Sequence, residues 1–247
     1  MSPAIRIEEL TFHYREEPEL FTHFNLQVDA GSRFGLFGPN GAGKTTLMNL
    51  MTGMLTADSG NIRLLGREMR PHDRAVHSLF GFVPQDLALY PDLSPAENLA
   101  FFGALSGMRG PAIRKRTREL LQILGLAAVR DKKVRQFSGG MKRRINLAIG
   151  VIHQPRLLFL DEPTVGVDVQ TRHAIIGYLK QLNEAGTTLV YTSHQLAEAE
   201  ELCDRVALID KGRIIAHDQL DRLLEVHRHD GLEGLFLHLT GKNYRDQ

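Results

Sequence analysis

The stretch Gly38-Pro39-Asn40-Gly41-Ala42-Gly43-Lys44-Thr45 decides how the rest of the sequence is interpreted. It fits the pattern Gly-x-x-x-x-Gly-Lys-Ser/Thr, whose glycines let the backbone curl so that successive N–H groups converge on phosphate oxygens. The apolar run over residues 33–37 predicts a short strand before it, and the spacing of Leu47, Leu50 and Met51 predicts a helix over 43–55 after it. This order of strand, loop and helix indicates a phosphate-binding loop.

Each residue type in this loop has a chemical reason to be there. The N-terminus of the following helix adds partial positive charge, and Lys44 brings a full charge to the β and γ phosphates. The Thr45 hydroxyl is a candidate Mg²⁺ ligand. A dinucleotide fold is disfavoured because its glycine spacing differs from the glycines at 38, 41 and 43. The candidate nucleotide-binding residues of this region are Gly38, Pro39, Asn40, Gly41, Ala42, Gly43, Lys44, Thr45 and Thr46.

A second candidate site follows the apolar run at residues 157–160, which ends in Asp161 and Glu162. Two carboxylates at the end of a buried strand are costly unless a cation or a reaction needs them. We expect Asp161 to hold Mg²⁺ through water and Glu162 to act as the general base that polarises the attacking water. The alternative is a strand that ends in a solvated acidic turn, and the phosphate loop upstream disfavours it.

The remaining pattern predicts an α/β protein. Apolar spacing over 5–12 and 24–28 is strand-like, the segment 94–153 predicts helices at 95–105, 112–124 and 139–152, and strand-like runs return at 156–160, 187–192 and 206–210. We expect a mainly parallel sheet as the core, an antiparallel β portion at the front and a helical insert in the middle. Apolar residues at helical spacing over 232–239 predict a C-terminal packing helix.

Composition narrows the classes of protein. The 247 residues carry a net charge of +1 and one cysteine, so composition supports neither nucleic-acid binding nor an intrachain disulfide. The basic run 142–144 is interpreted as one polar turn of a helix. No segment reaches the roughly 18 consecutive apolar residues of a membrane span, and residues 1–6 lack the apolar region of a secretory signal. Action at a membrane would therefore need a partner.

The run Phe137-Ser138-Gly139-Gly140-Met141-Lys142-Arg143-Arg144 lies shortly before the acidic strand and opens a predicted helix. On its own it predicts a serine N-cap with a glycine turn. In order with the other motifs, it resembles the signature sequence of the ATP-binding cassette (ABC) ATPase family, over essentially the whole chain. The resemblance implies a P-loop NTPase core, binding of ATP and Mg²⁺, and ATP hydrolysis. It also implies one nucleotide-binding domain over 1–247, with the core and β subdomain at 1–85 and 154–247 and a helical subdomain at 86–153.

The resemblance also assigns roles to single residues outside these motifs. Tyr14 is expected to stack on adenine, with core packing as its alternative and Phe12 as a weaker candidate. Gln85 matches the glutamine that contacts Mg²⁺ and the water, and Asp168 matches the loop that crosses a dimer interface. His194 matches the histidine that reads the γ-phosphate, although alone it would be taken for a structural histidine.

The family mechanism involves two cassettes that face each other head to tail. Ser138 and the backbone N–H groups of Gly139 and Gly140 would cap the γ-phosphate bound to Lys44 of the opposite subunit. We expect an ATP-induced homodimer in which ATP favours the closed state, with the helical insert conveying closure to separate transmembrane permease subunits. The expected location is the cytoplasmic, inner face of the cell membrane, through that permease.

One departure concerns Met141, which stands where the commonest signature has a glutamine, and methionine cannot replace the glutamine's hydrogen bonds. With residues 142–144, 164–168 and 236–241, it resembles the branch that exports drugs, polysaccharides or lipids. An importer subunit and a soluble ABC ATPase of translation or DNA maintenance remain alternatives. The single cassette and the lack of sustained heptads between Lys44 and Asp161 favour transport. A non-catalytic module is disfavoured because Lys44, Asp161, Glu162 and His194 are all present. The candidate catalytic residues are Lys44, Gln85, Glu162 and His194.

Overall fold

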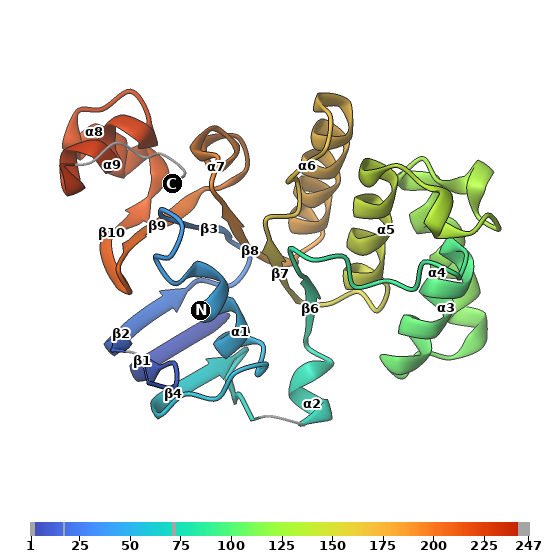
Figure 1. The fold of residues 1–247 in the computed structure, drawn as a ribbon, viewed down its shortest axis with the longest axis horizontal. Helices are drawn as coiled ribbons and strands as arrows, with labels where there is room; N and C mark the ends of the chain where they lie inside the picture. Colours follow the sequence, from blue (N-terminus) through green and yellow to red (C-terminus); the bar gives the residue numbers. More distant parts are fainter. Residues whose placement is uncertain (1–2, 17, 71–72, 242–247) are drawn as a thin grey trace. The chain divides into compact units, whose positions relative to one another are not determined.

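The structure is a computed structural model that describes residues 3–16, 18–70 and 73–241. Met1 and Ser2, which belong to the N-terminal segment considered above, lie outside the described residues. The chain divides into two compact units (Figure 1): unit 1 comprises residues 1–79 and 188–247, and unit 2 comprises residues 80–187. Among the described helices, none combines the length and hydropathy needed to cross a bilayer.

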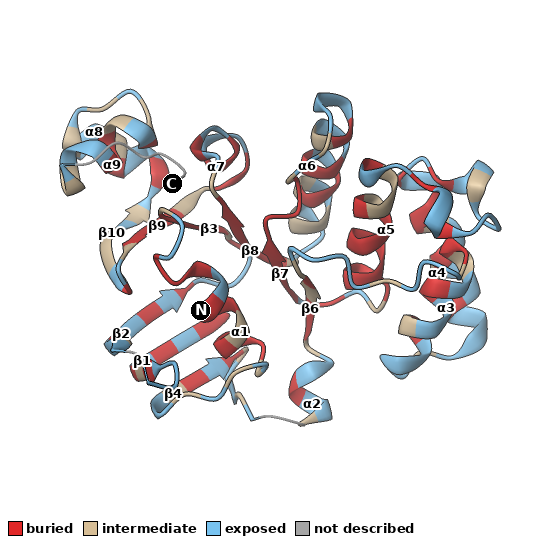
Figure 2. Cartoon of the chain, viewed as in Figure 1, coloured by how far each residue is buried: buried red, intermediate tan, exposed pale blue. Residues whose placement is uncertain are grey.

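An antiparallel sheet forms the first half of unit 1, in the strand order β2-β1-β4-β5. Its strands are β1 (Ile5–His13), β2 (Glu19–Val28), β4 (Ser59–Leu64) and β5 (Arg67–Glu68). Buried and exposed residues alternate along much of β1 and β2 (Figure 2), as expected for a sheet with one face on the core and one in water. This sheet matches the antiparallel portion predicted for the front of the sequence.

The second sheet of unit 1 contains the strand that leads into the phosphate loop. Strands β10 (Arg213–Gln219), β9 (Arg205–Asp210), β3 (Arg33–Phe37) and β8 (Thr188–Ser193) lie side by side in this order. β3 is parallel to both β8 and β9, and β10 is antiparallel to β9. Every residue of β8 is buried, because parallel strands are covered on both faces.

The helices of unit 1 are α1 (Lys44–Met51), α2 (Arg74–His77), α7 (Leu196–Leu202), α8 (Leu220–His227) and α9 (Leu232–Thr240). α1 is shorter than the predicted 43–55, because Gly53 takes a positive φ of 73°. The predicted C-terminal helix is present as α9. Its Leu232, Leu235 and Phe236 are buried, and it contacts α7 and α8, so it has the packing role expected of it.

Unit 2 combines two parallel strands with four helices. The strands are β6 (Phe80–Val83) and β7 (Leu157–Asp161), and the helices are α3 (Pro95–Leu105), α4 (Gly110–Ile123), α5 (Gly139–Val151) and α6 (Val169–Glu184), with short 3₁₀ turns η1 (Ala127–Val129) and η2 (Val134–Gln136). The predicted helix 95–105 is confirmed. Ser94 caps it in a capping box with Glu97, and Pro95 occupies its first turn.

The segment 86–153, predicted to be a helical subdomain, contains α3, α4 and α5 and lies entirely within unit 2. Unit 2 also includes β6, β7 and α6. That the segment acts as a separate subdomain, within a single nucleotide-binding domain over 1–247, stays a prediction.

Acidification is expected to destabilise unit 2 through His153, which follows α5. The Nε2 atom of His153 lies 2.9 Å from the Phe80 carbonyl oxygen, and burial holds the pKa of this imidazole below its usual range. Because the unfolded chain takes up the proton more readily, the free energy of unfolding should fall as pH drops below about 6.5 toward the lower folded-state pKa. Thermal unfolding at pH 7.5 and 5.5 measures this.

The control for this prediction is His153→Gln, whose amide keeps a donor and does not titrate. The loss of thermal stability between the two pH values should be smaller in the variant than in the wild type. An equal loss in both proteins would show that His153 makes no such contribution.

Candidate nucleotide-binding site

The loop between β3 and α1 has the backbone that phosphate binding needs. Gly43 is the N-cap of α1 and has a φ of 103°, a left-handed conformation that favours glycine. A Cβ at this position would lie 2.9 Å from Cζ of Phe21. No described side chain caps the N-terminus of α1, and its first turn carries no acidic residue. The helix therefore points its partial positive charge at the loop.

Lys44 supplies a full positive charge inside this loop. Its side chain is buried, and Nζ donates hydrogen bonds to the carbonyl oxygens of Gly38 at 2.7 Å and Pro39 at 3.1 Å. Thr45 is exposed, so its hydroxyl is accessible to a ligand from solvent. An ammonium group, a helix N-terminus and an accessible hydroxyl together fit a triphosphate with its metal ion.

Tyr14 lies next to this helix. Its hydroxyl is 2.9 Å from the Thr46 hydroxyl, and its ring forms a T-shaped pair with the ring of Phe12 at a centroid distance of 5.0 Å. Tyr14 is 39% exposed whereas Phe12 is 5% exposed, so Tyr14 is the ring with a face available for stacking. The geometry thus favours Tyr14 over Phe12 as the candidate adenine contact.

His194 lies at the same edge of the sheet as the phosphate loop. In the parallel pair β3 and β8, Phe37 is opposite Ser193, so the loop and His194 follow their strands at the same level. Carboxyl ends of parallel strands form the edge where ligands bind in open α/β sheets. Unit 1 therefore groups the phosphate loop, Tyr14 and His194.

Unit 2 carries the acidic part of the candidate site. β6 and β7 are parallel with Val83 opposite Leu160, so Gln85 and Glu162 follow at the same edge. Nε2 of Gln85 donates a hydrogen bond to Oε2 of Glu162 at 3.1 Å. Asp161 and Glu162 are both buried, and a buried acid needs partners to stay charged.

Glu162 also has an unusual backbone. Its φ is +48°, in the left-handed region that costs a non-glycine residue about 1–3 kcal/mol. Such strain persists where the surroundings fix the residue, and it concentrates at functional sites. The turn after β7 thus holds the Glu162 backbone in a conformation that non-glycine residues seldom adopt.

The predicted signature opens α5 as a capped helix. Ser138 is the N-cap, and its hydroxyl accepts a hydrogen bond from the Met141 N–H at 3.3 Å. Ser138 and Gly139 are exposed, whereas a Cβ on Gly140 would lie 3.1 Å from Oγ1 of Thr171. Gly140 therefore packs closely against Thr171, while Ser138 and Gly139 present a helix N-terminus to solvent.

Asp168 is the N-cap of α6, beside the signature. Its two carboxylate oxygens accept hydrogen bonds from the N–H of Thr171 at 2.8 Å and from its hydroxyl at 2.9 Å. The backbone hydrogen bond from Thr171, more than any other contact, holds the pKa of Asp168 below its usual range. The structure therefore brings Gly140 and Asp168 together at Thr171.

Residues 142–144 lie in α5, as predicted for a polar turn of a helix, but their side chains do not all face solvent. Arg143 is buried, and its guanidinium donates to the carbonyl oxygens of Gln85 at 2.6 Å and Val165 at 3.4 Å. Arg144 is half-buried and donates to the Leu124 carbonyl oxygen at 2.8 Å. Sequence reasoning missed Arg143, which ties α5 to the loops after both parallel strands, because a charge run does not reveal which of its members faces the core.

No three His, Cys, Asp or Glu side chains gather to hold a metal ion in the part of the chain that the structure describes. A Mg²⁺ ion bound to nucleotide takes most of its ligands from phosphate and water and needs few from protein. Thr45, Gln85 and Asp161 carry hydroxyl, amide and carboxylate oxygens, which are the donors that Mg²⁺ prefers.

The fold, the phosphate-loop residues of unit 1 and the acidic residues of unit 2 define a class of protein. A parallel α/β sheet with a glycine-rich loop, a buried lysine and a helix N-terminus at its carboxyl edge is a phosphate-loop nucleotide-binding protein.

Comparisons with known proteins identify the family. The family model described as ABC transporter matches residues 21–165. The linearmycin resistance ATP-binding protein LnrL of Bacillus subtilis strain 168 is 47% identical over 192 residues, which cover 78% of this chain and 62% of LnrL. The Nod factor export ATP-binding protein I of Ralstonia nicotianae is 40% identical over 223 residues, covering 90% of this chain and 69% of that protein. A solved ATP-binding subunit of an ABC transporter superposes with a TM-score of 0.88 at 26% identity, covering 96% of this chain and 99% of that one.

The chain belongs to the ABC transporter family and carries the family's ATP-binding ATPase domain. The predicted fold class, a P-loop NTPase core with an antiparallel β subdomain and a helical insert, is confirmed by the likeness to the solved subunit. The chain spans 62% of the length of LnrL.

Proposed function

We propose that this chain binds ATP with Mg²⁺ and hydrolyses it to drive export through separate transmembrane permease subunits. The observation that carries the proposal is the phosphate loop with its buried Lys44, together with the buried Glu162 carboxylate that Gln85 contacts. Lys44 would neutralise the β and γ phosphates. Glu162 would take the proton of the attacking water, and Gln85 would orient both Glu162 and this water.

Other residues complete this chemistry in the proposal. Thr45, Gln85 and Asp161 would hold Mg²⁺, which supplies charge neutralisation at the phosphates. His194 follows β8 at the edge of the phosphate loop and would contact the γ-phosphate. Tyr14 offers its exposed ring to adenine.

A homodimer induced by ATP would complete each site with the signature of the other copy. The exposed N-terminus of α5 supports this role, because a helix N-terminus without bound acid attracts a phosphate. Asp168, joined to Gly140 through Thr171, would place the loop before α6 at the same interface. Binding of ATP between two copies would favour the closed state, and hydrolysis would release it.

Ser138→Ala tests this arrangement and is expected to impair hydrolysis in the opposite subunit. Loss of a charge-assisted hydrogen bond to phosphate should lower turnover about 10- to 100-fold.

Mixed dimers that pair the Ser138→Ala chain with a Glu162→Gln chain show whether Ser138 acts on the site of its own subunit or on that of the opposite subunit. The intact Glu162 site in such a dimer faces an intact Ser138, so it should keep near-normal turnover. In a second dimer, one chain carries both changes and its partner is wild type. The intact Glu162 then faces the altered signature, so this dimer should hydrolyse ATP slowly. Slow turnover in the first dimer with near-normal turnover in the second would contradict the head-to-tail arrangement.

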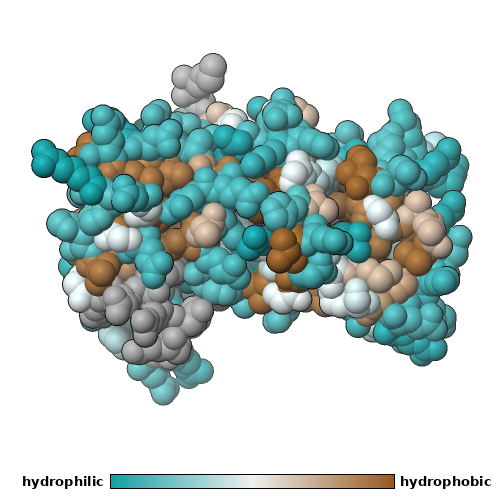
Figure 3. Space-filling model, turned by 90° about the horizontal axis from the view of Figure 1, so that it is seen from above, coloured by the Kyte–Doolittle hydropathy of each residue, from teal (hydrophilic) through white to brown (hydrophobic). Residues whose placement is uncertain are grey.

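An exposed aromatic patch on unit 2 supports docking to a permease. Tyr90 is 47% exposed, Phe101 44% and Leu105 73%. The rings of Tyr90 and Phe101 meet at a centroid distance of 4.9 Å, so the two side chains form one apolar surface beside α3. One face of the molecule shows apolar side chains scattered among hydrophilic ones (Figure 3). Clustered exposed aromatic residues mark protein contact sites.

The proposed direction of transport comes from the relatives. Those named above are a linearmycin resistance protein and a Nod factor export protein, and both names fit the removal of a compound from the cell. An importer subunit is the second candidate within transport. A soluble ABC ATPase of translation or DNA maintenance is less well supported, because it does not account for the patch at Tyr90 and Phe101.

Phe101→Glu is expected to weaken association with the permease by about tenfold or more, because an exposed aromatic side chain that the complex would bury is replaced by a charge. ATP binding by the isolated chain should stay unchanged. The partner to use is the membrane protein encoded beside this chain, with co-purification and ATPase stimulation as readouts. Val226→Glu, at an exposed apolar position of unit 1, is the matched control. Equal association of both variants would contradict the role of the patch.

A further inference from the structure

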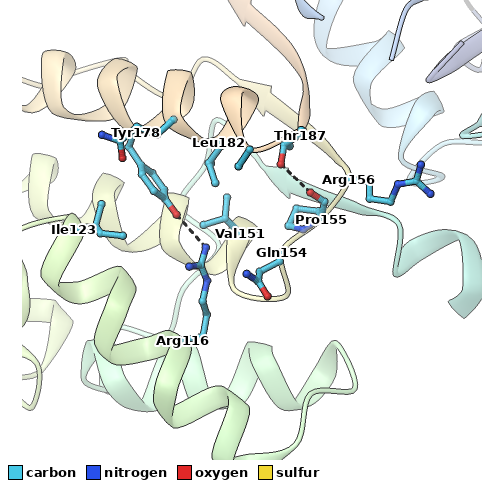
Figure 4. A pocket seen from close by; sticks show the side chains of 12 residues that line it. Arg116, Ile123, Val151, Gln154, Pro155, Arg156, Tyr178, Leu182 and Thr187 are labelled. Carbon is cyan, nitrogen blue, oxygen red and sulfur yellow. Dashed lines mark hydrogen bonds between the residues drawn. The ribbon is translucent and has the colours of Figure 1, made fainter. Parts of the chain in front are cut away.

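Unit 2 contains a cavity of about 310 Å³ that the proposed function does not use. We call it the α6 pocket, after the helix whose last turns line one side (Figure 4). Its apolar wall is formed by residues from the end of α4, the end of α5, the loop before β7 and the end of α6 with its C-cap, namely Ile123, Val151, Pro155, Leu182 and Ala185. A mostly apolar cavity of this size, with a few polar groups, is typical of a small-molecule site.

The polar end of the pocket is rich in donors. Nη2 of Arg116 donates to the Tyr178 hydroxyl at 3.2 Å, and Nη1 donates to Glu119 at 3.3 Å (Figure 4 shows the first bond). Nε of Arg116 is buried without a partner among the described residues. Burial raises the pKa of Tyr178, so its hydroxyl keeps a proton and can donate it. Arg116 has five N–H donors and no acceptor, so Arg116 and Tyr178 together have donors left for a ligand.

None of the residues lining the pocket is an aspartate or glutamate. The Arg116 side chain is 15% exposed, and Glu119 is the carboxylate that it contacts. A ligand that suits this lining has an apolar body for the wall and an anionic acceptor for Arg116 and Tyr178. We propose that the α6 pocket is a binding site for a small amphiphilic carboxylate.

The position of the pocket separates it from the nucleotide site. Pro155 lies before the first residue of β7, and Asp161 is its last residue. At about 3.3 Å per residue, the strand places its two ends more than about 13 Å apart. A carboxylate in the α6 pocket therefore does not contact Asp161 or Glu162, and this is a site of its own.

The pocket is nevertheless connected to the candidate dimer face. α5 begins after Ser138 and has Val151 at its other end, and α6 begins after Asp168 and has Leu182 near its other end. A ligand that contacts Val151 and Leu182 fixes the spacing of both helices. This connection rests on the proposed function, and through it the ligand would alter ATP-dependent closure.

Calorimetric titration of nucleotide-free protein with 4-phenylbutyrate tests the site. Saturable binding at one site per chain is expected, and the matched alcohol, 4-phenylbutan-1-ol, should bind about 10- to 100-fold more weakly. Arg116→Met removes the donors and keeps an apolar stem, so it should weaken carboxylate binding by a similar factor. Arg118→Met, on the same helix and outside the pocket, should bind as the wild type does. No nucleotide is present, so the result does not depend on the proposed function.

Two further variants keep the test decisive if Arg116→Met does not fold. Tyr178→Phe removes one donor and should weaken 4-phenylbutyrate binding several-fold. Ala185→Phe adds a large side chain at the mouth of the pocket and should abolish binding of both compounds. The proposal is overturned if wild-type protein shows no saturable binding. It is also overturned if the alcohol binds as well as the carboxylate, or if Ala185→Phe binds normally.

Discussion

Glu162→Gln is expected to lower the rate of ATP hydrolysis by a factor of about 10²–10⁴ and to leave ATP binding intact. The substitution keeps the size of the side chain and removes its ability to accept a proton. Glu162 is buried, and its carboxylate accepts a hydrogen bond from Gln85, so the structure gives this carboxylate a defined neighbour beside the proposed reaction. Phosphate release under saturating ATP and Mg²⁺ measures the effect.

The same variant should accumulate as a dimer, because ATP remains bound when hydrolysis cannot remove it. Size-exclusion chromatography with saturating ATP and Mg²⁺ is the readout. Glu184→Gln, at the exposed end of α6, is the matched control and should behave as the wild type does. A Glu162→Gln protein that turns over ATP normally, or that stays monomeric with ATP bound, would contradict the assigned role.

Lys44→Ala is expected to weaken ATP binding by about 10- to 100-fold. A hydrogen bond to a charged group contributes about 1.5–3 kcal/mol, and every 1.4 kcal/mol is a factor of ten in affinity. Lys44 is the buried cation of the loop, and its bonds to Gly38 and Pro39 oxygens hold the ammonium where phosphate oxygens would arrive. Isothermal titration calorimetry with ATP measures the change.

The variant also removes two hydrogen bonds within the loop, so its thermal unfolding should be measured beside its affinity. Lys115→Ala, at an exposed position of α4, is the matched control for the loss of one lysine. If a folded Lys44→Ala protein bound ATP as tightly as the wild type, the phosphate-binding role of the loop would be refuted.

The sequence predicted most securely what depends on neighbouring residues. The strand at 33–37 and the helix at 95–105 have the expected bounds, because turn and cap residues such as Ser94 and Pro95 act locally. The order of motifs was sufficient for the fold class and the family, which the comparisons confirm. The glycine spacing at 38, 41 and 43 decided between two folds, because it fits a phosphate-binding loop and differs from the dinucleotide-binding fingerprint.

The contacts between segments far apart in the chain could not be predicted from the sequence. The hydrogen bond between Gln85 and Glu162 forms because β6 and β7 are parallel neighbours. The sequence pattern does not predict which strands pair. The burial of Arg143 depends on which face of α5 meets the loops after those strands. The α6 pocket likewise arises where the ends of several elements leave space between them, which no local pattern encodes.

Magnesium-dependent release of phosphate from ATP by the purified chain, alone and with its permease, tests the central claim most directly. We predict release that requires Mg²⁺ and that falls steeply in the Glu162→Gln protein. Folded wild-type protein that neither binds ATP nor releases phosphate under either condition would contradict the account.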